Sequence, residues 1–126
     1  MRLIGIGTDI TSIQRITAML ERHGERLARR ILHPDEYADF TAAAQPAAFL
    51  ARRFAAKEAV SKALGVGIGA RMRFEDAQVD HDVSGRPLLK LSGPAAVTAA
   101  ALGAREIQIS LSDEREYALA FVIITG

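Results

Sequence analysis

The sequence contains no cysteine among its 126 residues. Disulfide bonds, thiolate metal sites and cysteine nucleophiles are therefore excluded, and a reducing cytoplasm is the expected location. No apolar run is long enough to span a bilayer, and the first residues lack the basic and then apolar pattern of a signal peptide. We therefore expect no association with a membrane.

A large excess of charge of either sign is also missing, because 16 Lys and Arg stand against 15 Asp and Glu. A nucleic-acid-binding protein usually has a stronger basic excess, so we expect no nucleic-acid partner. The charges are nevertheless unevenly distributed. Residues 1–73 contain 12 Lys and Arg against 7 Asp and Glu, whereas residues 74–126 contain 4 against 8. This division suits contacts between subunits, or an acidic partner that docks on the first half.

The length and the 49% of hydrophobic residues predict one globular domain, residues 1–126, with no internal repeat or linker. Periodicity and turn residues predict strands over 3–10, 77–83, 88–91, 107–112 and 117–124, and helices over 13–23, 25–31, 46–64 and 93–103, with another helix that starts at 33–36. This order of elements indicates an α+β fold in which an antiparallel sheet packs against the long helix.

The long predicted helix carries an acid and a base one turn apart. Glu58 and Lys62 project from the same face of a helix, with Phe54 one turn earlier. A carboxylate and an amine held side by side can bind a metal ion and a phosphate together. They can also form an ion pair that only stabilises the helix, and the helix alone leaves both interpretations open.

Asp9 is a second candidate, because it ends an otherwise apolar strand and must face water or a partner. It could cap the following helix, although we expect Thr11 to be the N-cap residue there. It could instead be a metal ligand. Magnesium prefers oxygen ligands and often takes one or two carboxylates together with substrate phosphate. Asp9 and Glu58 would form such a pair if the first strand lies against the long helix.

Two segments carry a family resemblance, namely Gly7-Thr8-Asp9-Ile10 and the run from Arg53 to Ala59 that is followed by Ser61-Lys62. They resemble the two signatures of holo-acyl-carrier-protein synthase, the small bacterial type of 4′-phosphopantetheinyl transferase. The resemblance extends to residues 65–69, 85–87 and 110–114 and covers essentially the whole chain. Five short motifs in the right order and at the right spacing are far more specific than any one of them.

The resemblance implies a Mg²⁺-dependent reaction of fatty acid biosynthesis. The phosphopantetheine arm of coenzyme A passes to a serine of apo acyl carrier protein, and adenosine 3′,5′-bisphosphate is released. In that reaction the catalytic residues would be Asp9, Glu58 and Lys62: the two carboxylates hold Mg²⁺ against the pyrophosphate, and Lys62 contacts the phosphate. The group that accepts the serine proton is left open between Glu58, Asp9 and a metal-bound water.

The resemblance also implies a set of coenzyme A contacts. Arg53 would grip the 3′-phosphate with two parallel hydrogen bonds. The other expected contacts are Lys62, Gly65, Gly85, Arg86, Pro87 and Ser110. Residues 85–87 could equally be a plain hairpin turn, and the glycines from position 65 onward a helix stop. They do not match the phosphate-binding loop that ends in Gly-Lys-Ser/Thr. Many members of the family have histidine where this chain has Asp113, so no role of that histidine is transferred.

Five arginines between residues 15 and 30 form a basic patch. Four of them are the expected docking residues for an acidic acyl carrier protein: Arg15, Arg22, Arg26 and Arg29. Alternatively, the patch is an ordinary solvated helix surface. The strand over 117–124 is apolar on both faces, so it is either central in the sheet or covered by another subunit. The family resemblance implies a homotrimer with active sites between subunits.

Two other functions remain to be weighed against the transferase. A carrier-binding module that has lost catalysis would keep the fold, but the presence of Asp9, Glu58 and Lys62 argues against it. A nucleotide-binding domain that acts on a different acceptor is the other alternative, and the basic patch makes it less attractive.

Overall fold

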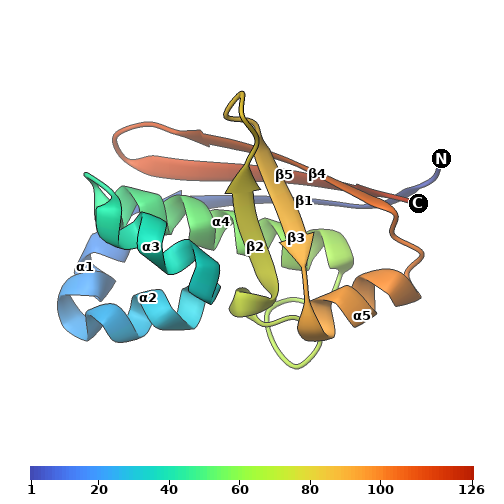
Figure 1. Ribbon diagram of the computed structural model, residues 1–126, viewed down its shortest axis with the longest axis horizontal. Helices are drawn as coiled ribbons and strands as arrows, with labels where there is room; N and C mark the ends of the chain where they lie inside the picture. The colour runs from blue at the N-terminus through green and yellow to red at the C-terminus, as the bar shows by residue number, and fades with distance from the viewer.

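A long helix packed under a three-stranded antiparallel sheet forms the centre of the molecule (Figure 1). The computed structural model describes residues 1–126. The elements in chain order are β1 (Leu3–Ser12), α1 (Ile13–His23), α2 (Glu25–Ile31), α3 (Pro34–Ala42), α4 (Pro46–Leu64), the 3₁₀ helix η1 (Phe74–Asp76), β2 (Ala77–His81), β3 (Pro87–Leu91), α5 (Gly93–Ala101), β4 (Glu106–Asp113) and β5 (Tyr117–Thr125). The predicted α+β fold is confirmed, and η1 is the one element that the sequence analysis missed.

The sheet has the order β1-β5-β4, so the apolar last strand β5 is the central one. Both of its neighbours run antiparallel to it. Strands β2 and β3 form a separate hairpin in which β3 lies beside β4, away from β1. In Figure 1 this hairpin crosses in front of the sheet, with its turn at the top of the view.

The inner face of the sheet is made of unusually small residues where it meets α4. A Cβ atom at Gly5 would overlap the carbonyl oxygen of Ala63, and one at Gly7 would overlap that of Ala59. Ala120 of β5 is fully buried on the same face. Strand β1 therefore lies directly on the backbone of α4. Because side chains alternate along a strand, Asp9 points to the same side as the two glycines, toward α4.

A second apolar cluster forms where α1, α2 and α3 pack around the first half of α4. Its most deeply buried members are Ile16, Ala28, Ile31, Leu50, Ala51 and, from β5, Ala118. Helix α4 is thus covered by the sheet on one side and by helices on another, and its Phe54-Glu58-Lys62 face stays partly open. Gly65 ends α4 in the left-handed conformation, with φ of 75°, as expected for a C-cap glycine.

The cap of α1 differs from the sequence prediction. Ser12, not Thr11, is the N-cap residue, and its hydroxyl accepts a hydrogen bond from the backbone N–H of Arg15 at 3.2 Å. Thr11 continues β1 because the strand pairs with β5 as far as Ser12 and Tyr117. Its hydroxyl donates to Asp9 instead. None of the helices has the length and apolar character needed to cross a membrane.

Replacing Gly7 by alanine should separate β1 from α4. The new methyl group meets the backbone carbonyl of Ala59, which cannot rotate away, so we expect a loss of about 1–3 kcal/mol in the free energy of unfolding. Denaturant unfolding measures it. Gly69→Ala is the matched control, because a Cβ there meets nothing within 4 Å and the backbone needs no left-handed conformation. Equal stability of the two variants would contradict the close contact.

Candidate active site

Asp9 and Lys62 meet where β1 crosses α4. The Nζ atom of Lys62 donates to Oδ1 of Asp9 at 3.3 Å and to the backbone carbonyl of Thr8 at 2.9 Å. The Asp9 side chain is 15% exposed, whereas that of Lys62 is 52% exposed. The structure thus places the first strand against the long helix, as the metal-site hypothesis required. Half of the lysine remains accessible to a ligand.

Glu58 completes this group from the preceding turn of α4. Partial burial raises the pKa of its carboxyl, the nearby negative charge of Asp9 raises it further, and Lys62 acts in the opposite direction. Glu58 and Asp9 are therefore close enough to repel each other when both are ionised. A cation placed between them would relieve that repulsion.

The donor set fits magnesium that is shared with a substrate. No third His, Cys, Asp or Glu joins the two carboxylates in a cluster that could hold a metal ion. A magnesium ion commonly takes one or two carboxylates and completes its six ligands with water and phosphate oxygens. Asp9 and Glu58 can supply the protein ligands, and the exposed side of Lys62 leaves room for a phosphate group.

Thr11 is a site residue that the sequence analysis misjudged. Its hydroxyl donates to Oδ2 of Asp9 at 2.7 Å, while Lys62 contacts Oδ1. The two hydrogen bonds hold the carboxylate from both ends, which fixes its rotamer. The alternation of residues 7, 9 and 11 along one face of β1 was the signal available in the sequence.

A hollow of about 270 Å³ opens beside Asp9, between β1, α1 and α4. Asp9 and Arg15 supply charged groups to its lining, and Met19, Phe54 and Tyr117 supply apolar surface. The hollow therefore has an apolar surface that lies between the Asp9 carboxylate and the arginines of α1. Met19 and Tyr117 were not among the predicted site residues.

The predicted docking arginines all lie on the surface of α1 and α2. Arg15, Arg22 and Arg26 are exposed and form no salt bridge. Arg29 is partly neutralised by Glu25, at 3.7 Å, and its guanidinium lies 5.0 Å from the centre of the Tyr37 ring. The first three arginines are thus the ones free to meet an acidic surface.

Arg53 does not lie at the surface, as its predicted contact with the 3′-phosphate would require. Its side chain is only 5% exposed, its Nε atom lies 3.3 Å from Oε2 of Glu36, and its guanidinium stacks 4.5 Å from the Phe49 ring centre. Burial, the largest influence, lowers its pKa. Residue 53 is one position off the face that carries Phe54 and Glu58, and this rotation of about 100° turns it into the core. Its guanidinium is engaged by Glu36 and Phe49 in this position.

The remaining predicted coenzyme A contacts do not all gather around Asp9 in one chain. Gly65 adjoins Lys62 at the end of α4. Gly85 and Arg86 are exposed in the β2–β3 turn, which precedes Pro87 at the start of β3. This turn is organised by Asp82, whose carboxylate accepts hydrogen bonds from Ser84 and from the backbone N–H of Arg86; these bonds lower its pKa. The hairpin lies beside β4, whereas Asp9 lies on β1 at the opposite edge of the sheet.

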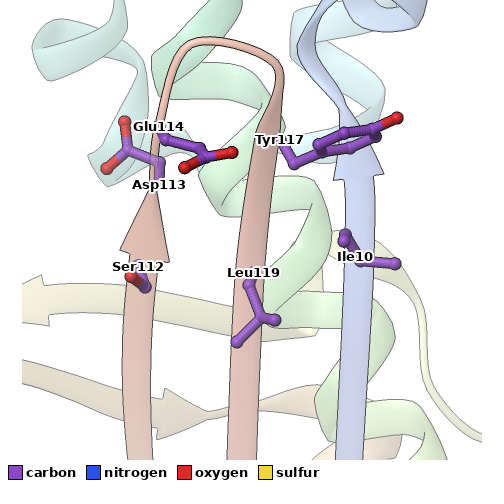
Figure 2. A pocket seen from close by; sticks show the side chains of 6 residues that line it. All are labelled: Ile10, Ser112, Asp113, Glu114, Tyr117 and Leu119. Atoms are coloured by element: carbon purple, nitrogen blue, oxygen red, sulfur yellow. The ribbon is translucent and has the colours of Figure 1, made fainter.

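Ser110 lies on the outer face of the sheet, opposite Phe121 of β5. Figure 2 shows the neighbouring part of that face, where side chains of β1, β5 and β4 border a hollow of about 260 Å³. Asp113 ends β4 at this hollow and pairs with Arg52 of α4 at 3.3 Å. Asp113 thus ties the β4–β5 turn to the long helix.

Comparisons with known proteins show to which family the chain belongs. The sequence profile of the 4′-phosphopantetheinyl transferase superfamily matches residues 5–122. A holo-[acyl-carrier-protein] synthase of Halorhodospira halophila is 57% identical over 125 residues, 98% of this chain and 99% of the relative. The crystal structure of the synthase from Neisseria meningitidis superposes with a TM-score of 0.93 at 38% identity, covering 98% of this chain and 99% of that one.

The synthase of Helicobacter pylori, solved in complex with coenzyme A, has a TM-score of 0.84 at 32% identity and covers 95% of this chain and 99% of its own. With its profile match, its full-length relatives and its fold, the chain belongs to the 4′-phosphopantetheinyl transferase superfamily and, within it, to the holo-[acyl-carrier-protein] synthases.

The raised pKa of Glu58 predicts a specific dependence of stability on pH. The folded state binds the Glu58 proton more tightly than the unfolded state, in which the carboxyl has its ordinary pKa of 4.5. The corresponding stability is therefore present below pH 4.5 and is lost as pH rises through the folded pKa. Relative to the wild type, Glu58→Gln should gain stability over this window. Urea unfolding in metal-free buffer at a series of pH values measures it, and parallel curves would contradict the repulsion from Asp9.

Proposed function

We propose that this protein transfers the 4′-phosphopantetheine group of coenzyme A to a serine of apo acyl carrier protein, in the cytoplasm and with Mg²⁺ as cofactor. The observation that carries the proposal is the meeting of Asp9, Glu58 and Lys62 on an open side of α4, next to the hollow that Arg15 borders. These residues supply metal ligands, a phosphate contact and an approach for the acceptor. The full-length similarity to holo-[acyl-carrier-protein] synthases supports the same reaction.

Asp9 and Glu58 would hold the magnesium ion, which when bound supplies positive charge against the pyrophosphate of coenzyme A. Thr11 keeps Asp9 in the orientation that this requires. The exposed ammonium group of Lys62 binds a phosphate oxygen and stabilises the charge that develops as the bond to the leaving group breaks. Holding coenzyme A and the serine side by side supplies much of the remaining rate enhancement.

We further propose that the active protein is a homotrimer. Ile6 and Ile10 of β1 are 60% and 62% exposed, and Leu119 and Phe121 continue this apolar surface across β5 (Figure 2 shows Ile10 and Leu119). A neighbouring subunit would cover the surface, as apolar patches of this kind require. It would also bring a second set of coenzyme A contacts, such as residues 85–87, to the site formed by Asp9 and Glu58.

The basic patch on α1 and α2 would receive the acyl carrier protein, which is acidic around its modified serine. Arg15 belongs both to this patch and to the hollow beside Asp9, so a partner docked on the arginines presents its serine to the site. Charge complementarity of this kind increases the rate of association and orients the partner.

Transfer itself is tested by mixing the protein with apo acyl carrier protein, coenzyme A and Mg²⁺ and measuring the intact mass of the carrier. We expect the mass to increase by one phosphopantetheine group with the wild type and with Glu106→Ala, a control for an exposed carboxylate distant from the site. Glu58→Ala should lower kcat at least about a hundredfold, because it removes charge stabilisation in the transition state. No mass increase with the wild type would refute the proposal.

Docking is tested by Arg22→Glu, which reverses one unpaired charge of the patch. We expect the KM for the carrier protein to rise about tenfold, with the KM for coenzyme A nearly unchanged, because the charge acts only on the acidic partner. The effect should diminish as salt is added. Arg105→Glu, an exposed arginine beside the far end of the sheet, is the matched control. A similar rise in both KM values for Arg22→Glu would argue against the docking surface.

If each active site combines residues of two neighbouring subunits, two variants that are inactive alone should complement each other in a mixed trimer. Glu58→Ala and Arg86→Ala trimers should each be nearly inactive. When the two chains are coexpressed, each mixed trimer should regain about one of its three sites, because one interface then combines an intact Glu58 with an intact neighbouring Arg86. The activity of mixed trimers, purified with two different tags and sized by native mass spectrometry, measures this. A monomeric wild type, or mixtures without recovered activity, would contradict the arrangement.

A further inference from the structure

The most unusual feature outside the site is a buried cluster of charges on the inner side of α4. The carboxylate of Glu36, from the first turn of α3, is 1% exposed, and the ammonium group of Lys57 is fully buried. Arg53 completes the cluster. The cluster contains two cations and one anion within the core. One of the cations, Lys57, is the residue directly before Glu58 in α4.

Every polar neighbour of the Glu36 carboxylate is a donor. Oε1 accepts hydrogen bonds from Nζ of Lys57 at 2.5 Å and from the backbone N–H of His33 at 2.8 Å. Oε2 accepts one from the backbone N–H of Val79 at 3.0 Å and lies 3.3 Å from Nε of Arg53, a charge contact without hydrogen-bond alignment. A glutamine would turn its NH₂ group against donors, so the position requires a carboxylate.

Stability alone does not explain this cluster. Burial is the largest influence on Lys57 and lowers its pKa, while Glu36 raises it. Exchanging a buried ion pair for apolar side chains of similar size is often neutral or stabilising, so such a pair is weak evidence for a purely stabilising role. What the cluster does supply is a defined geometry, because three hydrogen-bond donors and the Arg53 guanidinium, from the start of α3, from α4 and from β2, converge on two oxygen atoms.

Those segments carry both halves of the proposed coenzyme A site. Lys57 directly precedes Glu58, so its fixed ammonium group determines how α4 is rotated about its axis. Val79 lies on β2, which leads into the turn that contains Gly85 and Arg86. Val79 is paired with Leu89 of β3 on one edge of β2 and donates its N–H to Glu36.

We propose that Glu36 is a positioning residue for coenzyme A: it ties the β2–β3 hairpin to the helix that carries Glu58 and thereby fixes the nucleotide-binding turn relative to Glu58 of the same chain. The inference rests on the proposed function. In the proposed trimer each chain supplies Glu58 to one site and its hairpin to a neighbouring site, so the tether sets the spacing of these two half-sites in every chain, and loosening it misplaces the hairpin at every site.

The experiment separates tethering from mere charge balance. Glu36→Gln leaves two buried cations without an anion and should lower stability. Glu36→Gln combined with Lys57→Met restores the net charge of the cluster but not the tether. We expect the double variant to regain part of the thermal stability, because only Arg53 is then buried without an anion. Its KM for coenzyme A should stay raised about tenfold or more, the loss of one charged hydrogen bond. Its KM for the carrier protein should change by less than about twofold, because the basic patch is untouched.

Asp76→Asn is the matched control. Asp76 is another buried carboxylate, but it binds Arg73 and the backbone N–H of Ala95, linking η1 to α5 rather than to α4. It should lower stability without raising the KM for coenzyme A. If the double variant recovers a wild-type KM together with its stability, Glu36 only balances charge. If Asp76→Asn raises the KM as much, general destabilisation is the cause.

A readout independent of catalysis distinguishes this proposal from the proposed function. Hydrogen exchange of the Val79 amide should be at least about tenfold faster in Glu36→Gln than in the wild type, after correction for global stability. An equal rate would overturn the tether even if transfer is normal. Should Glu36→Gln not fold, Lys57→Met removes the hydrogen-bonded one of the two α4 partners of Glu36 and leaves only the longer contact with Arg53, and its KM for coenzyme A must then rise. Absence of transfer by the wild type, with faster Val79 exchange in the variant, would reject the function and retain the tether.

Discussion

The direct contact between the backbone of β1 and the backbone of α4 is the constraint on which the site depends. Gly5 and Gly7 lie against the carbonyl groups of Ala63 and Ala59, where any side chain would collide. The close approach brings Asp9, on the same face of the strand, within reach of Glu58 and Lys62. The carboxylates of Asp9 and Glu58 and the ammonium group of Lys62 therefore lie close together, although β1 and α4 are far apart in the sequence.

Helix α4 is held on several sides, which keeps this place rigid. The sheet fixes it from one side through the two glycines, and Glu36 fixes it from another through Lys57 and Arg53. The face with Phe54, Glu58 and Lys62 is left partly open. A site built on a rigid helix and strand can keep catalytic groups within the small tolerances that phosphoryl transfer demands.

Much of the fold could be predicted from the sequence, because local signals mark its elements. The bounds of α4 follow from Pro46 at its first turn and Gly65 just past its end, and both agree with the structure. The meeting of Asp9 and Glu58 could be predicted only as a condition, since it depends on a tertiary contact. Arg53 was misplaced because family motifs name residues without giving their rotation about the helix. Glu36 escaped notice because its partners lie on distant segments, and no local pattern marks a buried carboxylate.

The central claim is that Asp9 and Glu58 act as one metal site, and a double-mutant cycle on Mn²⁺ affinity tests it most directly. Mn²⁺ binding in the presence of coenzyme A would be measured by electron paramagnetic resonance for the wild type, Asp9→Asn, Glu58→Gln and the double variant. We expect each single substitution to weaken binding at least about tenfold and the second to add little, because residues of one site are strongly non-additive. Fully additive losses, or a wild type that binds no tighter than the double variant, would contradict the account.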